Sequence, residues 1–283
     1  MKKNFPFLLA LAAIPLAAGF AAPVTAGEAL ANAGDAAPAS GHVLTANIGL
    51  FSSYRFRGID QTFGRPALQG GFDYVHSSGF YAGNWNSNVS SGAGYPEGNL
   101  EMDFYGGYKT TFGDSGDFGV DVGAIYYYYP GTDLTTSNAG KTNSGRVDNT
   151  ELYVAASWKF LSLKYSRAVS DYFAMPDSKG SSYLDLSASY PLGDGWGINA
   201  HLGRLDFRNV ANGSYSDWKL GVSKDVAGWV LGAAYVGTDA RGDCGKSEFY
   251  CFSSSLSSQN VQNGSRTRDA GRGIAVLSLS RTF

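Results

Sequence analysis

Apolar and polar residues alternate along residues 43–57, the first patterned segment of the chain. The even positions from Leu44 to Phe56 are mostly apolar, whereas Arg55 and Arg57 fall in the more polar odd set. A β-strand sends successive side chains to opposite faces, so this pattern predicts a strand with one apolar and one polar face. The two arginines are then expected on the polar face, near the end of the strand.

The same period-2 alternation recurs in later segments and predicts twelve strands in all. The expected strands are 43–57, 66–77, 79–90, 99–112, 117–129, 149–160, 162–173, 181–192, 196–207, 215–226, 229–238 and 272–283. Tight turns alternate with longer loops, which are 58–65, 91–98, 130–148, 174–180, 208–214 and 239–271. An even number of antiparallel strands, with short turns at one rim and long loops at the other, is typical of outer-membrane barrels.

The N-terminal residues and the composition agree with an exported barrel. Lys2 and Lys3 precede an apolar run, which predicts a cleaved signal peptide over 1–26, with cleavage after Ala26 or, alternatively, Ala22. Residues 27–41 are then a flexible leader, and 42–283 form the barrel. Charged residues make up only 16% of the chain, and beyond the signal no apolar run is long enough for a spanning helix. A closed barrel crosses a bilayer without one, and the net charge of −2 argues against nucleic-acid binding.

The polar face of the strands predicts the residues that line the lumen. These are Arg55, Arg57, Asp73, Asn84, Asn86, Glu101, Asp103, Lys109, Asp121, Glu151, Lys159, Lys164, Asp185 and Lys219. One interpretation is a constriction of mixed charge that selects solutes by charge and size. The other is a set of ion pairs that fills a small barrel, because twelve strands fall between plugged and water-filled barrels.

Three smaller patterns refine this picture. Arg167 and Arg204 fall on the apolar face of their segments, so we expect a β-bulge to turn Arg167 inward and Arg204 to reach a headgroup region. The amides of strand 79–90 are expected to face the lumen, where they either bond a solute or are solvated. Outward aromatic residues predict an interfacial girdle, formed by Tyr126, Tyr128, Trp85, Trp158, Trp196 and Trp229.

The sequence predicts a disulfide, but it contains none of the catalytic or metal-binding motifs that were searched for. Cys244 and Cys251 lie in the longest loop of an exported chain, so we expect them to form a disulfide. Neither stands in a metal-ligand pattern, and GxSxG and HExxH are both absent from the chain. A Ser/His site formed by residues that are distant in sequence stays an open alternative, because such a site needs no local motif. We expect no metal site, no cofactor and no enzymatic activity.

The blocks of the chain resemble a known family. Phe283 ends an amphipathic strand and resembles the C-terminal assembly signature of bacterial outer-membrane proteins. The stretches "SSYRFRGIDQT", "SGFYAGNWNSNV", "EMDFYGGYKTTFGD", "LDLSASYPLGDGW" and "DWKLGVSKDVAGW" resemble, in order, the TorF family of proteobacterial porins. The resemblance runs from about residue 44 to the end, and it implies an outer-membrane barrel with a channel role.

We therefore predict a porin-like channel in the bacterial outer membrane for passive diffusion of small hydrophilic solutes. Its expected partners are these solutes, membrane lipid and lipopolysaccharide, and the outer-membrane assembly machinery, which meets the C-terminal strand. Loops 130–148 and 239–271 are expected to gate the lumen. Two alternatives stay open: an outer-membrane lipid-modifying enzyme, and a closed structural or adhesive barrel that acts through its extracellular loops.

Overall fold

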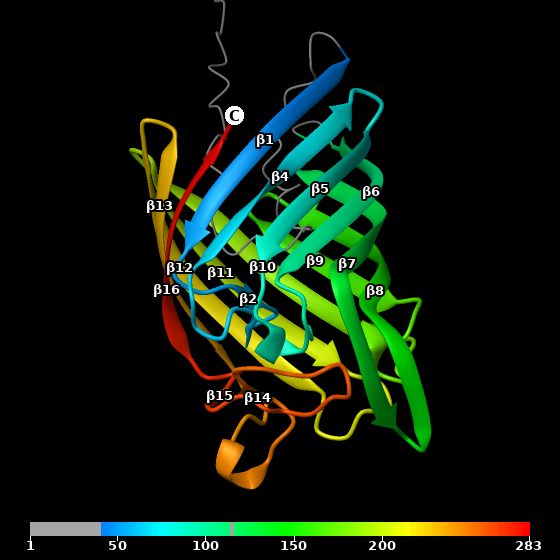
Figure 1. Ribbon diagram of the computed structural model, residues 1–283. Coiled ribbons are helices and arrows are strands. Elements are labelled where there is room, and N and C mark those ends of the chain that lie inside the picture. The colour runs from blue at the N-terminus through cyan, green and yellow to red at the C-terminus, as the bar shows by residue number, and fades with distance from the viewer. Residues whose placement is uncertain (1–40, 114–115) are drawn as a thin grey trace, which may run out of the picture.

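Twelve strands close into one antiparallel barrel (Figure 1). The computed structural model describes residues 41–113 and 116–283. The barrel strands are β1 (His42–Phe51), β4 (Ala67–His76), β5 (Phe80–Asn88), β6 (Leu100–Phe112), β7 (Phe118–Asn138), β8 (Lys141–Trp158), β9 (Leu161–Ala168), β10 (Ser182–Gly193), β11 (Trp196–Asp206), β12 (Tyr215–Val226), β13 (Trp229–Thr238) and β16 (Ile274–Thr282). Neighbouring strands are antiparallel, and β1 pairs with both β4 and β16 to close the barrel. The predicted fold class is confirmed.

The remaining elements lie in the connections. They are the short strands β2 (Arg55–Phe56), β3 (Ile59–Asp60), β14 (Cys251–Ser253) and β15 (Thr267–Asp269), and the 3-10 turns η2 (Ser91–Ala93), η3 (Tyr172–Ala174) and η4 (Cys244–Lys246). Within the described ranges, no helix has the length and apolarity needed to cross a membrane. The predicted signal peptide, 1–26, lies outside the described residues, and so does the leader, 27–41, apart from Gly41.

The two rims of the barrel differ in the length of their connections. Figure 1 shows the start of β1 and the C-terminus at the rim of tight turns, which we call the short-turn rim. The opposite, long-loop rim carries the connections 52–66, 89–99, 169–181, 207–214 and 239–273. The prediction of a loop over 130–148 is wrong, because β7 and β8 continue through it as a projecting hairpin. Pro130 and Gly131 lie at a register shift rather than at a strand end, and Ala139 and Gly140 make the turn with positive φ.

The outer face of the barrel is apolar. Large side chains there are widely exposed, among them Leu44 at 71% and Leu277 at 62%. Their strand neighbours point inward and are buried, as Phe51 and Val276 are. A closed sheet with an exposed apolar exterior leaves no unpaired edge and suits a hydrocarbon environment.

Strand β5 has the opposite orientation to the one predicted. Asn84 pairs with outward Phe72, so Asn84 and Asn86 face outward, and their prediction as lumenal residues is wrong. Trp85 faces inward and is only 2% exposed, so its prediction as a girdle residue is also wrong. The outward amides are satisfied locally: Asn86 Nδ2 donates to Asn84 Oδ1 (2.6 Å), and Asn84 Nδ2 donates to the Asp103 carbonyl (3.0 Å). The Trp85 ring packs inside because residues 52–66 fill the lumen beside it.

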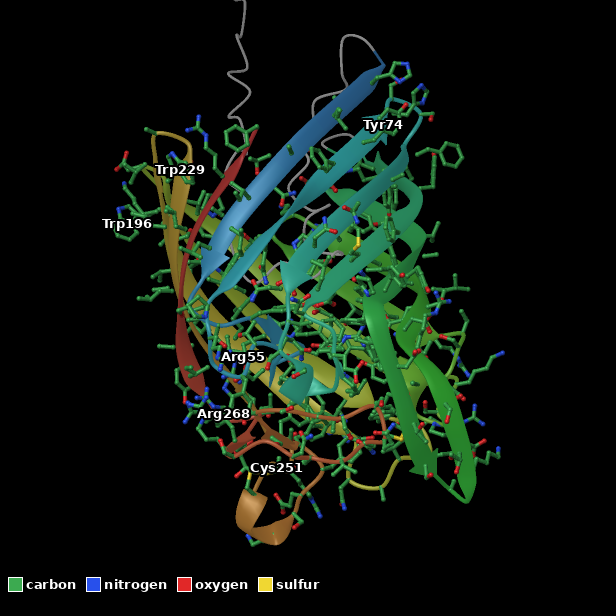
Figure 2. The ribbon with its side chains drawn as sticks, in the orientation of Figure 1. Arg55, Tyr74, Trp196, Trp229, Cys251 and Arg268 are labelled. Atoms are coloured by element: carbon green, nitrogen blue, oxygen red, sulfur yellow. A yellow bond between two sulfur atoms is a disulfide. The ribbon has the colours of Figure 1, made fainter. Side chains whose placement is uncertain are left out.

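Aromatic residues and cations form a band at the short-turn rim. Trp158, Trp196 and Trp229 are all exposed and outward, and Figure 2 shows the last two at this rim. Lys159 was predicted to line the lumen, and this is wrong, because it occupies the exposed turn after β8 with its Nζ 5.4 Å from the Trp158 ring centroid. Lys and Arg side chains that stack on interfacial rings keep their charge near the headgroups.

Other residues that were predicted to lie on the apolar face, namely Tyr126, Tyr128, Arg167 and Arg204, are nearer the long-loop rim. Tyr126 and Tyr128 are outward, half-buried and stacked on each other, with centroids 6.1 Å apart. Arg204 is exposed near the end of β11 and donates to Ser216 Oγ (3.2 Å). The predicted bulge at Arg167 is wrong, because β9 keeps regular pairing with β8 and Arg167 stays outward, opposite Leu152. Arg167 is one residue from the end of β9, where a charge costs little.

Candidate functional site: a plugged, charged lumen

The first long connection folds into the barrel and fills the half of the lumen near the long-loop rim. We call residues 52–66 the plug. Within it, β2 and β3 pair as a small hairpin, and Tyr54, Arg55 and Asp60 are buried. The Tyr54 ring packs edge-on against Trp85, with centroids 5.4 Å apart. The plug therefore explains why β5 turns Trp85 inward.

Arg55 and Arg57 belong to this plug, and strand β1 ends before them at Phe51. The predicted continuation of the strand to residue 57 is wrong. Arg57 and Gly58 both have positive φ, which a strand does not accommodate. Arg55 and Arg57 do avoid lipid, as expected. They do so because a loop, and not a strand, carries them into the lumen.

Arg57 attaches the plug to the barrel wall. Its Nη1 and Nη2 donate to the two carboxylate oxygens of Glu151 on β8, at 3.0 and 2.8 Å, and Nη1 also donates to Tyr172 Oη (2.8 Å). The Tyr215 hydroxyl donates to the Arg57 carbonyl (2.9 Å). Burial lowers the pKa of Arg57, but the Glu151 carboxylate together with Tyr172 and Tyr127 raises it, and the net shift is upward. A buried bidentate pair of this kind is specific in geometry and sensitive to loss of either partner.

Arg55 attaches the plug to the longest connection, 239–273. Its Nη1 donates to the Ala270 carbonyl (2.9 Å), and its Nη2 lies 3.7 Å from Asp60 Oδ2. Arg268 Nη1 approaches the same Asp60 oxygen at 3.6 Å, so two arginines flank one carboxylate. Figure 2 shows Arg55 and Arg268 close together near the long-loop rim. The plug is thus attached to the barrel wall through Arg57 and to the connection 239–273 through Arg55 and Asp60.

The same connection contains the Cys244–Cys251 disulfide, on the outer side of the long-loop rim (Figure 2). We predict that its reduction accelerates trypsin cleavage at Arg241 and Lys246 several-fold, because this short cross-link restricts the local chain rather than the barrel. Limited proteolysis of folded protein with and without dithiothreitol measures this rate. The double variant C244S/C251S serves as the control and should be insensitive to dithiothreitol. An equal rate for reduced and oxidised wild-type protein would contradict the prediction.

Charged side chains of both signs face the lumen on β4 and on β6 to β12. Lys109 lies opposite Asp121 across β6 and β7, and Lys164 lies opposite Asp185 across β9 and β10. Asp73 on β4 accepts from Tyr105 Oη (2.5 Å), and Glu101 on β6 accepts from Tyr129 Oη (2.8 Å). The predicted charged residues on the lumenal side of the strands are Asp73, Glu101, Asp103, Lys109, Asp121, Glu151, Lys164, Asp185 and Lys219.

A histidine that the motif search did not single out is central to this wall. His201 lies between two carboxylates: its Nδ1 is 2.8 Å from Asp185 Oδ2, and its Nε2 is 2.8 Å from Asp217 Oδ1. Both ring nitrogens face carboxylate oxygens, an arrangement that favours the doubly protonated imidazolium ring. Ser187 Oγ lies 3.4 Å from Nδ1 and donates to Asp185 (2.5 Å). The Ser/His/Asp combination therefore lacks a free basic nitrogen and does not form a nucleophilic site.

A small cavity lies where the plug meets this wall. Its volume is about 60 Å³, which is space for about four waters at roughly 15 Å³ each. The charged side chains that line it are Arg55, Arg57, Lys164, Asp185, His201, Asp217 and Lys219. The lumen therefore combines the plug with a charged cavity beside it that is large enough for water.

An apolar exterior around a closed strand barrel, with a polar interior, defines a transmembrane β-barrel protein. The chain belongs to a bacterial protein family: residues 35–263 match the family described as "Bacterial protein of unknown function (Gcw_chp)". A search of curated proteins gave no match.

Several solved barrels are similar to this chain. A KdgM porin structure has 10% sequence identity and a TM-score of 0.46, with 84% of this chain and 99% of that chain covered. A NanC porin structure has 12% identity and a TM-score of 0.43, covering 85% and 99%. A structure titled the P. putida toluene transporter TodX has 11% identity and a TM-score of 0.41, covering 87% and 91%.

Proposed function

We propose that this chain is an outer-membrane channel for small hydrophilic solutes, in which the plug, residues 52–66, controls the opening. The charged cavity of about 60 Å³ beside the plug carries this proposal, because a barrel that served only as a scaffold has no need for a charged lumenal chamber. The resemblance to TorF porins supports the same function. Solutes then move down their gradient when the plug shifts, and no bond is made or broken. Gating by the 130–148 hairpin is not part of the proposal.

The proposal includes the surroundings of the barrel. The long-loop rim faces the lipopolysaccharide leaflet and the short-turn rim faces the periplasm, in keeping with the usual arrangement of such barrels. Phe283 is 65% exposed, and its backbone pairs with Ala46 at the seam of the barrel. The ring is thus accessible to an assembly machinery that recognises the last strand.

A lipid-modifying enzyme receives less support. Such an enzyme needs an activated nucleophile on the outer face, but His201 is lumenal and held by two carboxylates. His76 contacts Ser78 (2.6 Å) at the short-turn rim, and in the described part of the chain no carboxylate orients this ring. One observation, the buried plug, favours a closed adhesive barrel. The experiment must therefore distinguish a channel from a closed barrel.

The deciding measurement is current through the refolded, signal-free protein in a planar bilayer, with reversal potential under a salt gradient. We predict discrete current steps, mostly closed at rest because the plug occupies the lumen. A barrel that folds, shown by a heat-dependent gel shift, but passes no current even when the plug is destabilised would support the closed adhesive barrel instead.

A further inference from the structure

The wall of the lumen carries more negative than positive charge. The carboxylates that face the lumen from the described strands are Asp73, Glu101, Asp103, Asp121, Glu151, Asp185 and Asp217. The cations on the same face of these strands are Lys109, Lys164, Lys219 and, counted as an imidazolium, His201. Seven carboxylates against four cations leave an excess of three negative charges, which ion pairs within the wall do not change. Lys141 and Asp225 lie beside hairpin turns, and including both leaves the excess the same.

The plug offsets part of this excess while it lies in the lumen. Its buried charged side chains are Arg55, Arg57 and Asp60, which together bring one positive charge. A shift of the plug out of the lumen therefore removes positive charge and leaves the acidic wall facing water.

Two carboxylates near the plug have no counter-charge. Glu101 and Asp103 both lie on the inward face of β6, and each is only 1% exposed. Glu101 Oε1 accepts from Tyr129 Oη (2.8 Å), but Glu101 Oε2 and Asp103 Oδ1 accept no hydrogen bond in the described part of the chain. Among the described residues, no Lys, Arg or His nitrogen lies within 4.0 Å of either carboxylate.

Tyrosines, and not cations, surround this carboxylate pair. The titratable side chains that interact with the pair electrostatically are Tyr54, Tyr95, Tyr105, Tyr127, Tyr129 and Glu151. Glu151 is itself bound to Arg57. Lys109 shares the inward face of β6, but it lies six residues beyond Asp103, toward the short-turn rim. The negative charge of the pair is therefore balanced by no neighbouring side chain.

The plug covers the pair through Tyr54. The Tyr54 ring packs against Trp85, and Trp85 lies opposite Asp103 in the pairing of β5 and β6. Burial and the charges of Glu101 and Asp103 raise the pKa of the Tyr54 hydroxyl well above its ordinary value. An unpaired carboxylate is costly to bury, so both carboxylates gain solvation and become open to a hydrated cation when the plug shifts.

We infer that the open lumen selects small cations, with Glu101 and Asp103 as its main charge contacts. The inference rests on the proposed channel function and names the class of solute that passes. Acidic side chains around a pore raise the local concentration of cations and lower that of anions. A passing cation also meets two oxygens that no protein group occupies, Glu101 Oε2 and Asp103 Oδ1.

The reversal potential of the refolded, signal-free protein under a KCl gradient gives the permeability ratio of K⁺ to Cl⁻. We expect this ratio to be several-fold above one. The double substitution Glu101→Gln and Asp103→Asn keeps the size of both side chains and removes both charges, so it should bring the ratio about halfway to one. Each single substitution should have a smaller effect, and the single variants replace the double variant if it lacks the folded gel band.

Asp148→Asn is the matched control. Asp148 lies on β8 opposite Tyr128, which in turn lies opposite Met102, between the two carboxylates of β6. It faces outward and accepts from Tyr126 Oη (2.7 Å), so its loss should leave the permeability ratio unchanged.

The outcomes separate this inference from the channel itself. A ratio at or below one, or a ratio that no substitution of Glu101 or Asp103 changes, would overturn the inference and leave the channel function in place. A folded wild-type barrel that passes no current would overturn the channel function and the selectivity with it.

Discussion

Arg57→Ala is expected to open the lumen and to destabilise the barrel. The substitution leaves Glu151 buried without its bidentate partner, and loss of one member of a buried ion pair costs about 3–5 kcal/mol. The carboxylate regains solvation if the plug leaves the wall and water enters. We therefore predict larger and longer current steps in planar bilayers, together with a lower midpoint in chemical unfolding of the detergent-refolded protein.

Arg146→Ala is the matched control for this prediction. Arg146 also pairs with a carboxylate, Asp148, but at 3.7 Å and with 59% of its side chain exposed. Exposed pairs contribute at most about 1 kcal/mol, so this variant should behave as wild type in both measurements. If Arg57→Ala shows wild-type currents and wild-type stability, the ion pair with Glu151 does not hold the plug.

The strands were predictable because alternation reports a physical requirement at every position. Lipid outside and polar side chains inside impose the period of two, and even the imperfect segments around Arg167 and Arg204 are real strands. The hairpin over 130–148 was missed because Pro130 and Gly131 normally end a strand. Here the register shift between Tyr128 and Asp133 absorbs them, and the pairing resumes beyond it.

The arrangement of the site was less predictable, because alternation says which face a side chain takes and not what occupies that face. The contact between Arg57 and Glu151 joins residues 94 positions apart, and it exists only because a loop turns inward. The environment of His201 draws on three strands, and no local motif identifies it. Its parity within 196–207 did place it inward, opposite Lys219, so this signal was present in the sequence.

In strand β5 the plug reverses the faces that an alternating pattern would normally predict, so that Trp85 lies inward and Asn84 and Asn86 lie outward. The usual rule places aromatic residues outward, but here the lumen beside the strand is a packed core that contains Tyr54. Trp85→Ala is therefore expected to leave a cavity between the plug and the wall, at a cost of about 3–5 kcal/mol. The temperature at which the folded gel band is lost measures this effect, and it should fall strongly.

Trp158→Ala removes the same side chain from the outer face, where Trp158 is 45% exposed at the short-turn rim. This residue contacts interfacial lipid or detergent instead of a rigid core, so its loss leaves no enclosed cavity, and we expect a clearly smaller fall in the same temperature. Equal effects of the two substitutions would mean that Trp85 lies in the girdle, as the alternation of the sequence had indicated. A larger effect at Trp85 requires a filled lumen, and it links the orientation of β5 to the presence of the plug.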